Sequence, residues 1–103
     1  MFVTCAAGAS PICAPAAPPA PAHYTVTITG FAFVPATLTV RSGDRVTWVN
    51  NDIVPHTATA TDGSWDTGTI EANGEVEITI PEEAGEDYLC RFHRAMTARL
   101  QSS

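Results

Sequence analysis

Residues 23–29 read His-Tyr-Thr-Val-Thr-Ile-Thr, and this stretch decides the fold class. Tyr24, Val26 and Ile28 alternate with threonines. Apolar side chains at every second position lie on one face of a strand, and β-branched residues favour the pleated conformation. The stretch is therefore predicted to form a half-buried β-strand.

The same period of two recurs along the rest of the chain. Turn signals such as Asn73-Gly74 separate the alternating segments roughly every 8–12 residues, and no window shows a sustained helical period. This pattern predicts an all-β, Greek-key-like sandwich of about seven or eight short strands. Because the sequence stops at Ser103, we expect a short final strand around residues 98–101. The alternating apolar residues of the later segments are Leu38 and Val40, Val46 and Trp48, and Val76, Ile78 and Ile80.

The N-terminal part of the chain has a different composition. Five of the eight prolines fall within residues 1–22, and residues 11–22 consist mainly of alanine and proline. Such a stretch favours extended polyproline conformations and cannot build a core. We therefore expect residues 1–22 to be a disordered leader and spacer, and residues 23–103 to be one folded domain.

The charge balance excludes several classes of function. The net charge is −6, and all five basic residues are arginine. An acidic chain is poorly suited to a nucleic-acid backbone, and the absence of lysine excludes Schiff-base chemistry. No apolar run approaches the roughly 20 residues that a membrane-spanning helix needs.

The three cysteines are unevenly placed. Cys5 and Cys13 lie in the leader, whereas Cys90 is alone in the predicted domain. Cys90 is then a buried thiol, a metal ligand or the disulfide partner of a leader cysteine. If the start codon is assigned late, Cys5 is a candidate lipid anchor of a bacterial lipoprotein; otherwise the segment is a simple disordered leader.

Two stretches carry the residues suited to chemistry. Residues 50–57 read Asn-Asn-Asp-Ile-Val-Pro-His-Thr, and residues 88–96 read Tyr-Leu-Cys-Arg-Phe-His-Arg-Ala-Met. A thiolate and a thioether are soft ligands that favour copper, and imidazole suits both of its oxidation states. Each residue alone has an ordinary interpretation as a core or surface side chain. Together they predict one copper ion with His56, Cys90, His93 and Met96 as its ligands.

These stretches, together with Asp-Gly-Ser-Trp-Asp-Thr-Gly at residues 62–68, resemble the cupredoxin family. Two residues separate Cys90 from His93, and two separate His93 from Met96. This short loop resembles the amicyanin-like branch more than the plastocyanins or azurins. The resemblance covers roughly residues 24–100, and it implies a β-sandwich with copper near one end.

The resemblance also implies how electrons would leave the protein. The second histidine ligand of the family is partly exposed within an apolar patch, a role that falls here to His93, with Phe92, Ala95 and Pro55 as candidate patch residues. A redox protein partner is expected to dock there, and the chain is expected to be a monomer. The resemblance further implies export to a bacterial periplasm or the envelope surface, where tethering as a lipoprotein is one option.

This sequence departs from the family pattern at two positions near the ligands. Thr57 replaces the asparagine that often follows the first histidine, although a hydroxyl can still make one bracing hydrogen bond. Arg94 replaces the proline that often follows the second. Arg91, Arg94 and Arg99 suggest a basic collar facing an acidic partner, and solvated side chains without a partner explain them equally well.

Four classes of function are compatible with residues of these types. The leading hypothesis is a type 1 copper protein that carries single electrons and is not an enzyme. The alternative is copper buffering or delivery in the cell envelope. A nucleophilic Cys90 with a histidine base would need a third orienting group and an oxyanion hole, and neither is evident in the sequence. Structural zinc seldom uses methionine.

Overall fold

The computed structural model describes residues 20–103. Cys5, Cys13 and the expected leader up to residue 19 lie outside the described residues. No helix within the described range is long and apolar enough to cross a membrane. The strands are β1 (His23–Thr29), β2 (Ala32–Val34), β3 (Thr37–Val40), β4 (Arg45–Asn50), β5 (Thr59–Ala60), β6 (Glu75–Thr79), β7 (Asp87–Cys90) and β8 (His93–Ser102).

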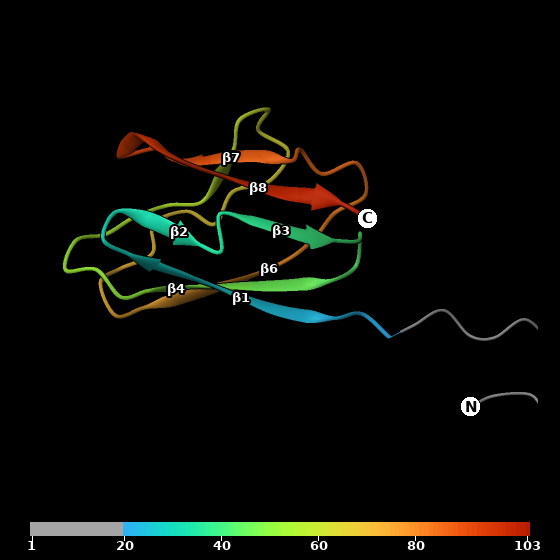
Figure 1. The fold of residues 1–103 in the computed structure, drawn as a ribbon, viewed down its shortest axis with the longest axis horizontal. Coiled ribbons are helices and arrows are strands. Elements are labelled where there is room, and N and C mark those ends of the chain that lie inside the picture. Colours follow the sequence, from blue (N-terminus) through green and yellow to red (C-terminus); the bar gives the residue numbers. More distant parts are fainter. Residues whose placement is uncertain (1–19) are drawn as a thin grey trace, which may run out of the picture.

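The eight strands form two four-stranded sheets packed face to face (Figure 1). One sheet has the order β2-β1-β4-β6, and the other has the order β3-β8-β7-β5. β1 runs parallel to β4 and β3 runs parallel to β8, while the other pairs are antiparallel. The predicted all-β sandwich is confirmed.

The alternation seen in the sequence gives one face of each strand to the core. Val26 of β1 lies opposite Trp48 of β4, and both side chains are fully buried. Ile28 and Val46 are also fully buried, whereas the threonines at 27 and 29 on β1 are half-buried or face the solvent side. The period of two therefore predicted the buried face of this sheet correctly.

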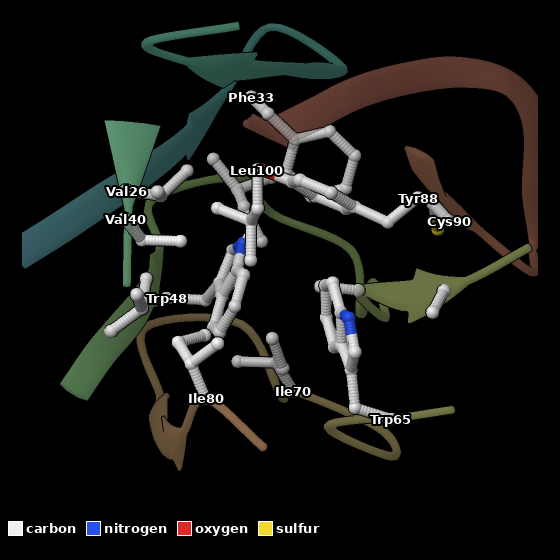
Figure 2. Close-up of a cluster of buried hydrophobic side chains, with 14 of the residues drawn as sticks. Val26, Phe33, Val40, Trp48, Trp65, Ile70, Ile80, Tyr88, Cys90 and Leu100 are labelled. Atoms are coloured by element: carbon white, nitrogen blue, oxygen red, sulfur yellow. Dashed lines mark hydrogen bonds between the residues drawn. The ribbon is translucent and has the colours of Figure 1, made fainter. Parts of the chain in front are cut away.

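An aromatic cluster fills the space between the sheets (Figure 2). The rings of Trp48 and Trp65 stack with centroids 5.3 Å apart, and Tyr88 contacts both rings edge-on or tilted. The indole N–H of Trp48 donates to the Tyr88 hydroxyl across 3.3 Å, and that of Trp65 donates to the carbonyl of Gly85 across 2.9 Å. Both tryptophans are therefore core residues whose polar atoms are satisfied.

The last strand differs from its prediction. β8 has ten residues and begins at His93, directly after the two-residue turn of Arg91 and Phe92. It pairs with β7 on one side and with β3 on the other. The expectation of a short strand near residues 98–101 was wrong, because the segment expected to be a ligand loop continues the sheet as a β-hairpin.

One end of the sandwich gathers both chemistry-bearing stretches. β1 and β4 run toward this end, β7 ends there at Cys90, and β8 starts there at His93 (Figure 1, left side). The start of β1 and the C-terminus lie at the opposite end. We call the first the ligand end of the molecule.

Candidate metal centre

His56 is held by the loop that follows β4. Asn50 is fully buried, and its amide N–H groups donate to the carbonyls of Val54 and Ile70, both at 2.9 Å. Its side-chain oxygen accepts the backbone N–H of Asp52, also at 2.9 Å. His56 exchanges two backbone hydrogen bonds with Ile70, at 3.1 and 2.7 Å. The loop is therefore fixed on both sides of the histidine.

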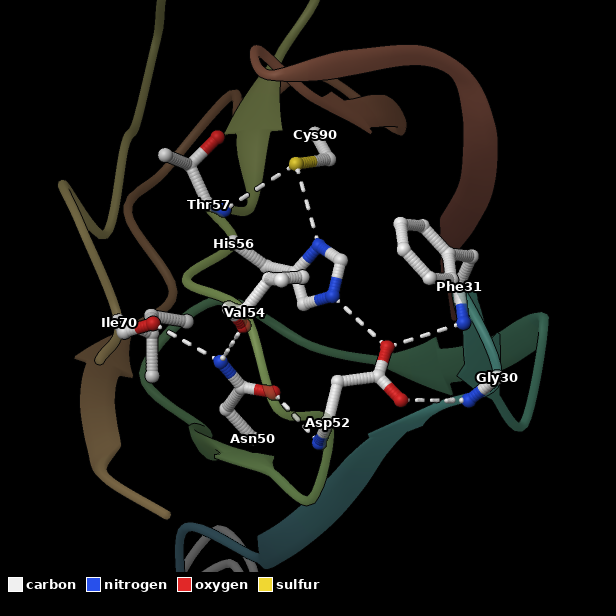
Figure 3. A network of polar contacts seen from close by, with 9 residues as sticks. All are labelled: Gly30, Phe31, Asn50, Asp52, Val54, His56, Thr57, Ile70 and Cys90. Atoms are coloured by element: carbon white, nitrogen blue, oxygen red, sulfur yellow. Dashed lines mark hydrogen bonds and ion pairs between the residues drawn. The ribbon is translucent and has the colours of Figure 1, made fainter. Parts of the chain in front are cut away.

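The side chains of His56 and Cys90 meet in the interior, although they are 34 positions apart in the sequence (Figure 3). Nδ1 of His56 lies 3.6 Å from Sγ of Cys90, and neither residue has any exposed surface. Nitrogen and sulfur ligands bind a metal at about 2.0 and 2.3 Å, so at an angle of about 110–120° they lie about 3.5–3.7 Å apart. The spacing of these two atoms fits a shared metal ion.

Thr57, the residue after His56, forms hydrogen bonds with Cys90 and with the residue after it. Its backbone N–H points at Sγ of Cys90 across 3.4 Å, and its hydroxyl accepts the backbone N–H of Arg91 across 2.8 Å. Thr57 is itself fully buried. The single hydrogen bond expected of a hydroxyl at this position is confirmed.

The hydroxyl of Thr57 also belongs to a closed polar network. It lies 3.1 Å from the hydroxyl of Thr59, which donates to Asp66 across 2.9 Å. Arg91 closes the network: its Nε donates to the hydroxyl of Thr59, and its Nη2 lies 3.3 Å from the Asp66 carboxylate. The turn after Cys90 is thus tied to the segment after His56 through both backbone and side chains.

This network changes the expected charge around the site. Arg91 is paired with Asp66, and Arg99 is paired with Glu86 and Asp87. Among residues 20–103, Arg94 is the member of the expected collar that forms no ion pair. The basic collar was a wrong expectation, since neighbouring carboxylates that are distant in sequence neutralise two of its three arginines.

His93 and Met96 occupy the start of β8. His93 is half-buried and pairs across the hairpin with Cys90, and its ring centroid lies 5.2 Å from that of His56. Met96 is 5% exposed and belongs to the hydrophobic core. In the described part of the chain, no three His, Cys, Asp or Glu side chains are close enough together to form a ready ion site. The four-ligand set therefore stays a prediction, and within it the donor atoms of His56 and Cys90 lie 3.6 Å apart.

Asp52 is a site residue that the sequence did not reveal. One oxygen of its carboxylate lies 2.8 Å from Nε2 of His56, the ring atom that faces away from Cys90. Burial raises the pKa of Asp52, but hydrogen bonds from Phe31, His56 and Gly30 outweigh it and hold the pKa below its ordinary value. The only sequence signal was a carboxylate four residues before the histidine.

Large apolar side chains are exposed around the ligand end. Ile53 is 93% exposed, and Phe31 and Phe92 are about half exposed. Pro55 and Ala95 are exposed as well, as the sequence predicted together with Phe92. Phe31 and Ile53 were not predicted. Ile53 belongs to the histidine loop itself, whereas only the folded chain brings Phe31, in the β1–β2 turn, beside His56.

Comparison with known proteins identifies the family. A family model for copper binding proteins of the plastocyanin/azurin family matches residues 20–101. The chain belongs to this family. No curated protein sequence matches it.

Solved structures agree with this assignment. An oxidised mutant of amicyanin is 25% identical to this cupredoxin, with a TM-score of 0.67 over 77% of this chain and 80% of the other. A purple cupredoxin from Nitrosopumilus maritimus is 26% identical, with a TM-score of 0.65 over 77% of this chain and 98% of the other. The predicted amicyanin-like resemblance and a single copper cofactor are confirmed.

A larger protein shares the same fold. The copper-containing nitrite reductase of Thermus scotoductus is 24% identical over 96% of this cupredoxin, but only 25% of the reductase chain is covered. The TM-score is 0.66. This likeness concerns the fold alone.

Proposed function

We propose that this cupredoxin is a type 1 copper protein that carries single electrons in the bacterial cell envelope. The observation that supports it best is the buried pair of donors, with Nδ1 of His56 at 3.6 Å from Sγ of Cys90. His56, Cys90, His93 and Met96 are the proposed ligands. Copper in such a donor set exchanges one electron between its two common oxidation states.

The surroundings of the donors suit a carrier that should change little between oxidation states. Asn50 fixes the loop of His56, and Thr57 fixes the turn after Cys90. No buried side-chain nitrogen or oxygen in residues 20–103 lacks a hydrogen-bond partner. A fully bonded surrounding of this kind resists rearrangement, which favours rapid electron exchange.

The proposed exit for the electron is His93. It is half-buried at the ligand end, where the half-exposed Phe31 ring lies 4.8 Å from its own ring and the exposed Phe92 precedes it in the chain. An exposed apolar surface next to a redox centre suits transient docking. We therefore propose a redox protein partner that contacts this surface largely through apolar side chains.

A nucleophilic role for Cys90 fits the structure less well. Asp52 does supply a group that orients His56, which the sequence had not shown. However, Cys90 and His56 are completely buried, so no substrate reaches the sulfur. A reactive cysteine needs at least partial exposure. We therefore retain the proposal that the chain is not an enzyme.

Export and tethering remain proposals that rest on the leader and on the family. Residues 1–22 are proposed to form a leader and an alanine- and proline-rich spacer, in which Cys5 is the candidate lipid attachment point. β1 begins at the end of the sandwich opposite the ligand end (Figure 1). A tether attached there would leave the surface around His93 free for a partner.

The visible spectrum during titration of the apo-protein with Cu(II) tests the proposal. We expect an intense thiolate-to-copper band that saturates at one equivalent, and a reversible one-electron wave in voltammetry. Cys90→Ser should abolish the band, whereas Cys13→Ser should retain it. Copper binding without the band would contradict the electron-carrier proposal and favour copper buffering or delivery.

A further inference from the structure

The turn between β1 and β2 has an unusual backbone. Gly30 and Phe31 both have positive φ, at 57° and 60°. Two consecutive residues in this region form the type I′ hairpin turn, which favours Asn and Gly. A bulky residue there is a conformational outlier, so other contacts must hold Phe31 in place.

Asp52 supplies these contacts from another loop (Figure 3). One carboxylate oxygen accepts the backbone N–H of Gly30 across 2.7 Å, and the other accepts that of Phe31 across 2.9 Å. The second oxygen also lies 2.8 Å from Nε2 of His56. One side chain, 11% exposed, therefore joins the strained turn to a proposed copper ligand.

The held turn presents its aromatic ring to both imidazoles. The Phe31 ring lies edge-on to His56, with centroids 5.4 Å apart and planes at 90°. It is also edge-on to His93, at 4.8 Å and 77°. Since His56 is buried and His93 is half-buried, the ring mainly restricts the space into which the His93 imidazole can turn.

We propose that Asp52 and Phe31 are positioning residues for the imidazole pair. Asp52 orients His56 directly and holds the Gly30–Phe31 turn, and the ring of Phe31 limits rotation of His93. The link to copper rests on the proposed function, but the restriction of the imidazoles belongs to the protein without metal. If Phe31 served only as docking surface, its removal would weaken partner binding and leave the ring of His93 unchanged.

The experiment uses NMR of the full chain without copper. Phe31→Ala should increase the amplitude of His93 ring motion, and Asp52→Ala should do the same while speeding hydrogen exchange at Gly30 and Phe31 more than tenfold. Asp52 is proposed to act on His93 through Phe31. The double variant should therefore increase the amplitude of His93 ring motion little more than Phe31→Ala alone does. Val34→Ala is the matched control, since Val34 lies in the same hairpin with nearly the same exposure, 51% against 50%.

Two further variants separate positioning from folding. Phe31→Tyr should restore the order of His93, whereas Phe31→Leu, which keeps an apolar side chain without an aromatic edge, should not. In the copper-loaded protein, Phe31→Ala and Asp52→Ala should speed copper release to a chelator about tenfold or more, as outer-shell changes do. Tyrosine rescue together with an unchanged urea midpoint would exclude a general loss of structure.

The outcomes distinguish this inference from the proposed function. Unchanged His93 motion in both Phe31→Ala and Phe31→Leu overturns the positioning role, whatever the copper spectrum shows. Increased motion together with a wild-type protein that lacks the blue band supports the positioning role and contradicts the electron-carrier proposal.

Discussion

The hydroxyl of Thr57 accepts the backbone N–H of Arg91 across 2.8 Å, although the two residues are 34 positions apart in the sequence. This bond ties the residue after His56 to the residue after Cys90. The two proposed ligands therefore keep their spacing through a contact in the protein itself, before any metal binds.

Thr57→Val should weaken this connection without changing the shape of the side chain. The Arg91 N–H would lose its acceptor; a fully buried donor left unpaired costs about 1–3 kcal/mol, and this partly buried one should cost less. We expect a lower urea midpoint and faster copper release. Thr57→Ser retains the oxygen and should stay close to the wild type; equal losses in both variants would contradict the role of the hydroxyl.

Asn50→Asp should destabilise the loop that carries His56. The carboxylate cannot donate to the carbonyls of Val54 and Ile70, which now accept the two amide N–H groups. We expect a loss of about 2–5 kcal/mol in the free energy of unfolding, measured with urea at pH 7. Asn51→Asp at the exposed neighbouring position should change it by less than about 0.5 kcal/mol. Comparable effects at both positions would show that added charge, not the lost donors, is responsible.

His93→Ala should lower copper affinity by more than about 100-fold, beyond the usual effect of outer-shell changes. His23→Ala is the control, since His23 starts β1 at the opposite end and contacts Thr47 and Glu77. Affinity is measured by competition with a chelator. An intact blue band and affinity in His93→Ala would remove His93 from the ligand set.

Tyr88 should make the protein sensitive to alkali. Burial raises the pKa of Tyr88 to about 12, with a smaller opposing effect from the Trp48 hydrogen bond. A group whose pKa is raised by folding stabilises the folded state fully below its unfolded pKa, near 10, and loses this contribution as the pH rises toward 12. The contribution is about 3 kcal/mol.

Urea midpoints between pH 8 and pH 12 measure this loss. Tyr88→Phe should flatten the alkaline decline, although it also removes the acceptor for the Trp48 N–H and lowers the midpoint at pH 8. Tyr24→Phe retains Tyr88 and should leave the decline in place. If the urea midpoint of Tyr88→Phe still falls steeply at alkaline pH, the alkaline loss of stability comes from another group.

Asp44 should contribute to acid sensitivity at the end opposite the ligands. Its carboxylate accepts the backbone N–H groups of Arg41 and Ala22, both at 2.9 Å, and these bonds lower its pKa. A carboxylate with a lowered pKa stabilises the fold above its unfolded pKa and loses the contribution as pH falls through the folded value.

Asp44→Asn should therefore lower the urea midpoint at pH 7 and reduce the difference between pH 7 and pH 2. An asparagine can accept only one of the two N–H groups through its oxygen, while its own amide faces the other. If the urea midpoint of Asp44→Asn falls between pH 7 and pH 2 by as much as that of the wild type, Asp44 is not responsible for the acid sensitivity.

The sequence by itself determined the fold class and singled out His56 and Cys90 as proposed donors. Val26, Trp48 and the other alternating residues predicted which strand faces are buried, because a period of two is a local property of the backbone. His56 and Cys90 were found through the chemistry of their side chains, which does not depend on context. The copper family followed from the same stretches, and the matched family model agrees.

Only the tertiary structure decided how those donors are held. The length of β8 depends on pairing with β3 and β7, and the ion pairs of Arg91 and Arg99 depend on carboxylates brought near by folding. Asp52 and Phe31 act across different loops, so no spacing in the chain could reveal their contacts with the imidazoles. Local patterns specify elements and donor chemistry, whereas the distances between residues far apart in sequence are fixed only when the two sheets pack.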